Sequence, residues 1–199
     1  MSYPTTPKFA TINLKSSHST LSSIAQSGRR QVRSLGGHSW AFTAKYDRLT
    51  RAEFMPVFAF ALSQRGQFGS FTIVPPDLAT PQGVATGTPL VNGASQTGNT
   101  LAINGATIST TGWLKAGDIF SISGDPKVYM LTADANTDGT GAVTLSFEPD
   151  LTVSPANNAA ITVTNVAFTM MFSGDVQEYG AVAPLRYNFE IDLIGPCNG

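Results

Sequence analysis

The chain has 199 residues, a net charge of −1, and charged side chains at only 13% of its positions. Globular proteins average about 25% charged residues, and a weakly charged surface is poorly protected against association, so we expect this chain to be buried in an oligomer. No run of 18 apolar residues occurs, which argues against a membrane-spanning helix and predicts no membrane insertion.

The N-terminal residues and the cysteine content point to assembly inside a cell. The first residues lack a basic region followed by an apolar one, so no secretory signal is expected. Cys197 is the single cysteine, which excludes an intrachain disulfide and a cysteine-based metal site. This cysteine usage fits assembly in a reducing cytoplasm.

The charges are distributed unevenly along the chain. Residues 1–65 hold nine Lys and Arg against two Asp and Glu, a net charge of +7, whereas residues 66–199 hold three against eleven, a net charge of −8. This polarity could orient identical subunits with a basic face against an acidic face. The alternative is that both sets of charges share one folded surface and cancel.

The first 47 residues predict strands separated by a loop. Residues 9–14 alternate as a half-buried strand does. The Ser- and Thr-rich stretch after them predicts a loop that leads into a strand near residues 30–32, and Gly36 and Gly37 predict a turn. The strand expected at residues 38–47 has one apolar face, formed by Trp40, Phe42, Ala44 and Tyr46.

The strongest helix signal spans residues 49–65. Thr50 and Glu53 have the spacing of a capping box, Pro56 predicts a kink, and Gly66 is expected to end the helix. The apolar residues recur at the spacing of one buried face, which would consist of Phe54, Val57, Phe58, Ala61 and Leu62. A short strand is expected at residues 71–74.

The middle of the chain differs in composition from its two ends. It is rich in Gly, Thr and Asn and almost free of Lys and Arg. Residues 83–166 therefore predict a small all-β module, a barrel or sandwich, inserted into an α+β frame formed by residues 1–82 and 167–199. Its expected strands are residues 101–103, 119–122, 127–131, 143–147 and 161–164. The expected fold class is mainly β.

The frame resumes after the module with two further expected strands, residues 166–172 and 185–194. The second has the clearest alternation in the chain and predicts a strand that runs from the edge to the core of the frame sheet. Its apolar face would consist of Leu185, Tyr187, Phe189, Ile191 and Leu193.

Catalytic patterns are absent from the sequence. His18 and His38 lie outside any motif of a nucleophilic triad, and His38 has the context of a structural or interface residue. Phosphate-binding loops and metal-spaced histidines are also missing. We therefore expect no enzyme, no catalytic residue and no cofactor, and a hydrolase acting on cell walls would need a constellation that the sequence does not show.

One stretch resembles half of a calcium loop. Asp134, Asn136, Asp138 and Gly139 match its first positions, but Leu145 stands where the closing glutamate belongs. A hairpin, in which Asp, Asn and Gly supply turn geometry, is the favoured interpretation, so no metal site is expected.

Two residue groups are candidates for binding. Arg29, Arg30 and Arg33 cluster, but no aromatic residues are interleaved with them, so we favour contact with acidic groups of a neighbouring subunit over specific nucleic-acid binding. Trp113 and Tyr129, together with Phe147, would form the aromatic platform of a carbohydrate-binding module. The alternative, packing in a small core, is preferred for these aromatic residues.

Several segments of the chain are informative when they are taken together. In the frame they are GGHSWAFTAKYDRLTRAEFMPVFAFALSQRGQFGSFTI and FTMMFSGDVQEYGAVAPLRYNFEIDLIG, and in the inserted module they are LVNGASQTGNTLAINGA, WLKAGDIFSI and KVYMLTADANTDGTGAVTLSFEPDL. In these segments the chain resembles the distal tail or baseplate proteins of tailed bacteriophages. The similarity covers roughly residues 30–195. It lies in the composition of these segments and in their order along the chain.

The resemblance implies a structural protein of the virion. The frame would have the tail-tube fold, a β-sandwich or barrel with one flanking helix, whose arginines Arg51 and Arg65 would face a neighbouring subunit. Copies would form a ring, a hexamer by this resemblance, that links the tail tube protein to the tail hub or baseplate proteins, after assembly in the cytoplasm of the bacterial host. Adhesion to host-surface carbohydrate through the inserted module is the alternative function.

Overall fold

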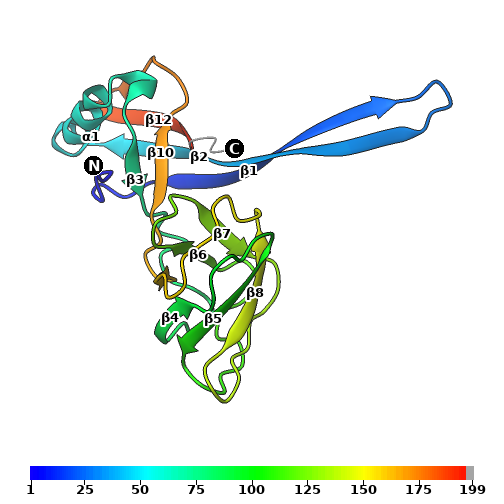
Figure 1. Ribbon diagram of the computed structural model, residues 1–199. Coiled ribbons are helices and arrows are strands. Elements are labelled where there is room, and N and C mark those ends of the chain that lie inside the picture. Colours follow the sequence, from blue (N-terminus) through cyan, green and yellow to red (C-terminus); the bar gives the residue numbers. More distant parts are fainter. Residues whose placement is uncertain (196–199) are drawn as a thin grey trace. The chain divides into compact units, whose positions relative to one another are not determined.

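A computed structural model describes residues 1–195 of the chain, and Cys197 lies outside them. Within residues 1–195 the protein is mainly β, as predicted, with one α-helix. It divides into two compact units (Figure 1). Unit 1 combines Met1–Ile73 with the chain from Thr169 onward, and unit 2 is Val74–Phe168. The sequence prediction had placed these boundaries at 82/83 and 166/167.

Unit 1 is built on one sheet with the strand order β1-β2-β12-β10-β3, and β11 pairs with β12 outside this path. Its strands are β1 (Thr11–Ile24), β2 (Arg30–Leu49), β3 (Phe71–Ile73), β10 (Phe168–Phe172), β11 (Tyr179–Val182) and β12 (Arg186–Ile194). β12 thus lies inside the sheet between β2 and β10. Leu185 precedes this strand and is 75% exposed, so its predicted place on the buried face is wrong.

The N-terminal hairpin differs most from the sequence prediction. The residues expected to form a loop continue β1, which pairs with β2 from Thr11–Lys45 to Ile24–Arg30. Gly36 and Gly37 lie within β2 and form a bulge instead of a turn, because the register shifts between the pairs His18–His38 and Thr20–Ser34. The distal half of the hairpin extends well beyond the other strands of the sheet (Figure 1).

The helix α1 (Arg51–Ser63) begins as predicted but faces the core differently. The Glu53 carboxylate accepts hydrogen bonds from the Thr50 amide at 2.9 Å and the Thr50 hydroxyl at 2.7 Å. The buried residues are Phe54, Val57 and Ala61, whereas Leu62 is 59% exposed, so its predicted burial is wrong. Leu62 is one residue, about 100°, past Ala61 on the helix, which turns it away from a face centred on positions i, i+3 and i+7.

The end of α1 also differs in detail. The helix runs through Pro56 to Ser63, and the first residue in the left-handed conformation after it is Arg65, with a φ of 57°. Gly66, predicted as the stop, follows with a φ of 67° and opens a short 3-10 helix, η1 (Gly66–Phe68). No helix within residues 1–195 is long and apolar enough to cross a membrane.

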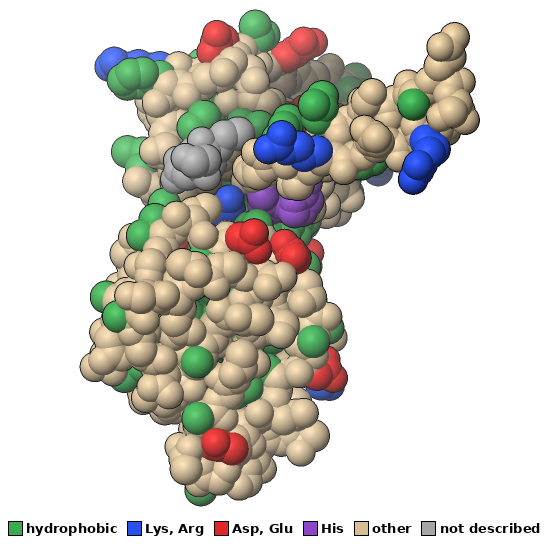
Figure 2. Space-filling view, turned by 45° about the vertical axis from the view of Figure 1, so that its right-hand side comes forward, with side chains coloured by type: hydrophobic (Ala, Val, Ile, Leu, Met, Phe, Trp, Pro, Cys, Tyr) green, Lys and Arg blue, Asp and Glu red, His purple; other side chains and the backbone are tan. Residues whose placement is uncertain are grey.

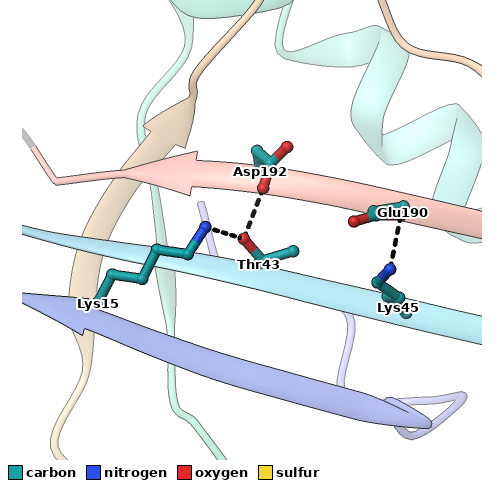
Figure 3. A network of polar contacts seen from close by, with 5 residues as sticks. All are labelled: Lys15, Thr43, Lys45, Glu190 and Asp192. Carbon is teal, nitrogen blue, oxygen red and sulfur yellow. Dashed lines mark hydrogen bonds and ion pairs between the residues drawn. The ribbon is translucent and has the colours of Figure 1, made fainter.

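The two faces of the unit 1 sheet have different chemistry. Aromatic rings from α1, β2 and β12 fill the covered face, where Phe54 stacks on Tyr187 at 5.0 Å. On the other face, Lys15 donates to Thr43 at 2.9 Å and Thr43 donates to Asp192 at 2.6 Å (Figure 3). Lys45 and Glu190 form an ion pair beside them at 3.0 Å. This half-exposed network joins β1, β2 and β12 without leaving a charge of either sign in excess.

Unit 2 is a nearly closed barrel. Its strand order is β4-β5-β8-β7-β6-β9, and Leu90 of β4 forms a bridge to Ala160 next to β9, which brings the two ends of the sheet together. The strands are β4 (Gly87–Val91), β5 (Thr100–Ala106), β6 (Ile119–Ile122), β7 (Val128–Leu131), β8 (Val143–Glu148) and β9 (Ile161–Thr162). Closure hides strand edges that would otherwise be free to pair with other chains.

Candidate assembly surfaces

The distal half of the β1–β2 hairpin, residues 17–37, has no protein layer on either face; we call it the arm. Every residue of the arm is exposed. Four of its side chains are large and apolar, with exposed fractions of 58–70%: Leu21, Ile24, Val32 and Leu35. An isolated two-stranded ribbon is marginally stable in water, so an arm with exposed apolar side chains on it is typical of a surface that another protein covers.

The arm is also purely basic. It holds Arg29, Arg30 and Arg33 and contains no Asp or Glu. Arg29 lies at the turn, where its carbonyl accepts a hydrogen bond from the Ala25 amide at 2.9 Å, and Arg30 and Arg33 pair with Ile24 and Leu21 on β1. On the face shown in Figure 2, basic side chains and no acidic ones lie on the arm, and by its sequence these basic side chains are arginines. The structure therefore brings the three predicted interface arginines together with the arm's apolar side chains.

A second exposed surface of unit 1 lies on residues 175–185, which we call the β11 segment. It contains Asp175 and Glu178 and no Lys or Arg, a net charge of −2. Four large apolar or aromatic side chains are exposed on it, namely Val176, Tyr179, Val182 and Leu185. The Tyr179 ring lies 5.0 Å from the rings of Phe54 and Phe58, which holds the segment against α1.

The other two predicted interface arginines lie at opposite ends of α1. Arg51 is the first residue of the helix and Arg65 follows its last turn, and both are exposed. They do not join the arginines of the arm in one cluster within this chain. A neighbouring hollow of about 420 Å³ is lined by Arg48, Arg186 and Asn188, with Val182 and Pro184 of the β11 strand and turn. Sequence reasoning missed this hollow because its arginines are 138 positions apart.

The two residues proposed to bind glycan lie in the core of unit 2. Trp113 and Tyr129 are both 0% exposed. The indole of Trp113 donates to the Thr86 carbonyl at 2.8 Å, and Tyr129 packs against the rings of Phe120 and Phe147. A sugar needs a free ring face to stack on an aromatic side chain, and these faces are enclosed. The core-packing alternative therefore accounts for both residues.

Burial and a hydrogen bond define the state of the Tyr129 hydroxyl. It donates to Asp125 at 2.6 Å. Burial, followed by this contact with a carboxylate, raises the pKa of Tyr129 to about 12. Its role is to close the core and to fix the turn before β7.

The side chains of the calcium-like stretch bind backbone amides instead. Asp134 accepts from the Ala116 amide at 2.9 Å and Asn136 from the Gly112 amide at 2.6 Å. Asp138 accepts from the hydroxyl of Thr140 and from the amides of Thr140 and Ala142, and these bonds lower the pKa of its carboxyl. Residues 1–195 contain no group of three or more His, Cys, Asp or Glu that could hold a metal ion. The side chains of this stretch therefore hold the backbone of its turns through hydrogen bonds.

The exposed apolar residues of the arm are the functional feature that sequence reasoning did not find. The signal was weak, because two serines separate Leu21 and Ile24 and the apolar residues show neither alternation nor a helical period. Only the spacing of apolar residues on both sides of Gly28 hinted at a hairpin.

Comparison with known families identifies unit 2. Residues 79–166 match the family model of distal tail protein pb9, B domain. No curated protein matches the chain. The match starts and ends within a few residues of the limits of unit 2, so the barrel and the family domain are the same element. The similarity of residues 79–166 to the B domain of distal tail protein pb9 confirms the resemblance to phage distal tail proteins and supports a structural role in a phage tail.

Proposed function

We propose that the chain is a ring subunit of the distal tail, in which copies of unit 1 contact one another in a closed hexameric ring that links the tail tube to the hub or baseplate. The observation that carries this proposal is the arm. A ribbon with exposed apolar residues and a net charge of +3 needs a partner to cover it.

The β11 segment has the properties that such a partner surface needs. It is acidic where the arm is basic, and both surfaces expose several large apolar side chains. A contact between the arm of one copy and the β11 segment of the next is heterologous, and heterologous contacts form a ring when the rotation between copies closes. The opposite charges would mainly determine which surface of one copy meets which surface of the next, and would contribute less to the affinity of the contact.

The sheet of unit 1 supports the same arrangement. Its terminal strands along the main path are β1 and β3, and the outer edge of β1 offers backbone groups over 14 residues. Long edges of this kind are prone to pair with other chains unless they are covered. In a ring of identical subunits, each neighbour would cover one such edge.

Native mass spectrometry of a charge-reversed arm tests the proposal. We expect the wild-type chain to form a closed oligomer, and we expect the double variant Arg30→Glu/Arg33→Glu to shift to monomers at low ionic strength, because the arm then repels the β11 segment. Lys8→Glu/Lys115→Glu makes the same change in charge outside the arm and should leave the oligomer intact. Wild-type assembly that is unaffected by the arm variant would refute the arm contact.

Reversal on the opposite surface sharpens the test. Glu178→Arg should weaken assembly alone and should partly restore it in the Arg30→Glu/Arg33→Glu background. If Glu178→Arg weakens assembly alone but does not restore it in the Arg30→Glu/Arg33→Glu background, the arm contacts a surface other than the β11 segment. If wild-type chains stay monomeric at all concentrations and also fail to form rings on isolated tail tubes, the ring function itself is refuted.

A further inference from the structure

The two histidines of the chain face each other across a strand pair. They are the chain's total complement of histidine and lie 20 positions apart in the sequence. The register of β1 and β2 places His18 directly opposite His38, at the base of the arm. Figure 2 shows the histidine side chains together at the surface of this face.

The ring geometry suits a shared metal ion. The two imidazole centroids are 4.6 Å apart and the ring planes are inclined by 58°. Zinc binds imidazole nitrogen at about 2.0–2.1 Å, so two rings that share one ion have centroids roughly 4.5–5.5 Å apart. The observed separation of the two ring centroids, 4.6 Å, lies at the lower end of this range.

The surroundings fix one of the two rings and leave the other accessible. His38 is 6% exposed, its ring lies edge-on to Trp40 at 4.5 Å, and its Nε2 atom lies 2.9 Å from the Ser16 hydroxyl. His18 is exposed. An ion at His38 Nε2 would take the place of the Ser16 hydroxyl, which lies on an exposed side chain and can rotate away.

We propose that His18 and His38 form a two-histidine site for a divalent transition-metal ion at the base of the arm. Imidazole ligands suit Zn²⁺, Cu²⁺ and Ni²⁺. The described residues bring no third His, Cys, Asp or Glu into a group with the pair, so water molecules complete the coordination. A bound ion would join the two strands beside the Gly36–Gly37 bulge and restrain the arm where it leaves the sheet.

Metal titration of the full-length, untagged chain tests this site. A Cys197→Ser background removes the single thiol. We expect calorimetry with Zn²⁺ to show one ion per chain, and we expect both His18→Ala and His38→Ala to abolish that binding. Ser17→Ala, next to His18 on the strand, is the matched control and should bind as the parent does. Because His18 is exposed, its variant keeps the fold even if His38→Ala does not.

Electron paramagnetic resonance with Cu²⁺ supplies a second readout. The parent should show two coordinated imidazole nitrogens and His18→Ala one. Binding that persists in His18→Ala, half an ion per chain accompanied by dimers, or no binding at millimolar metal would each overturn the proposal. None of these outcomes depends on ring assembly, so the metal site and the proposed function fail separately.

Discussion

Replacing Asp118 should loosen the part of unit 2 where the chain enters the barrel. Asp118 is 4% exposed, and its carboxylate accepts hydrogen bonds from three backbone amides, those of Gln82 at 2.7 Å, Gly83 at 3.0 Å and Lys115 at 2.8 Å. A Cβ atom on Gly83 would lie 2.6 Å from the Leu114 Cα atom, so the two segments pack too closely for a side chain at position 83.

The expected loss follows from the number of bonds. Hydrogen bonds to a charged group contribute about 1.5–3 kcal/mol each, and unsatisfied buried donors add to the loss. Because the three amides are part-buried, water should replace some of the lost bonds in Asp118→Ala. We therefore expect the free energy of unfolding of unit 2 to fall by about 3–5 kcal/mol. Asp134→Ala is the matched control, since this exposed carboxylate accepts one amide at 2.9 Å and should cost about 1 kcal/mol.

The two tryptophans make the measurement specific. Trp40 lies in unit 1 and Trp113 in the core of unit 2. In a Trp40→Phe background, urea unfolding followed by tryptophan fluorescence reports on unit 2 through Trp113 alone. If Asp118→Ala unfolds within ~1 kcal/mol of Asp134→Ala, the three-bond account of this carboxylate is refuted.

Two further predictions concern unit 1, and Trp40 fluorescence monitors both. Leu62→Asp should change the free energy of unfolding by less than about 0.5 kcal/mol because the side chain is exposed. Phe54→Ala should lower it by about 3–5 kcal/mol because the ring is fully buried among aromatic neighbours. Equal effects of the two changes would contradict the orientation of α1. Unit 1 should stay folded when residues 84–163 are deleted and the ends are joined by a short Gly/Ser linker. The reason is that β3 and β10, the strands on either side of unit 2, are neighbours in one sheet. A product without cooperative unfolding would contradict this expectation.

Local patterns predicted the elements whose residues alternate between a buried and an exposed face. In β12 the buried positions Tyr187, Phe189, Ile191 and Leu193 are each separated by one exposed residue. This period of two determines both the strand and its inner face. The capping box of α1 is equally local, since Thr50 and Glu53 carry the whole signal.

The features that escaped prediction depend on contacts between distant residues or on an absent core. Apolar residues occupy more of the circumference of α1 than one buried face. The sequence alone therefore could not decide whether Phe58 and Leu62 would lie on the buried face. The arm has no buried face, and a strand without one shows no period of two. His18 lies opposite His38 because the Gly36–Gly37 bulge shifts the register of β1 and β2. A short window of sequence does not contain both strands, so it cannot predict this pairing.

The place of insertion explains how one chain can combine a barrel with an assembly surface. Unit 2 departs after β3 and returns at β10, and these two strands are neighbours at one end of the unit 1 sheet. The arm belongs to the β1–β2 hairpin at the other end of the same sheet, and β12 lies between this hairpin and β10. Because the insertion joins adjacent strands, it interrupts no strand of the sheet, and the arm and the β11 segment need no residue of unit 2. The contacts that we propose for ring closure therefore involve residues of unit 1 alone.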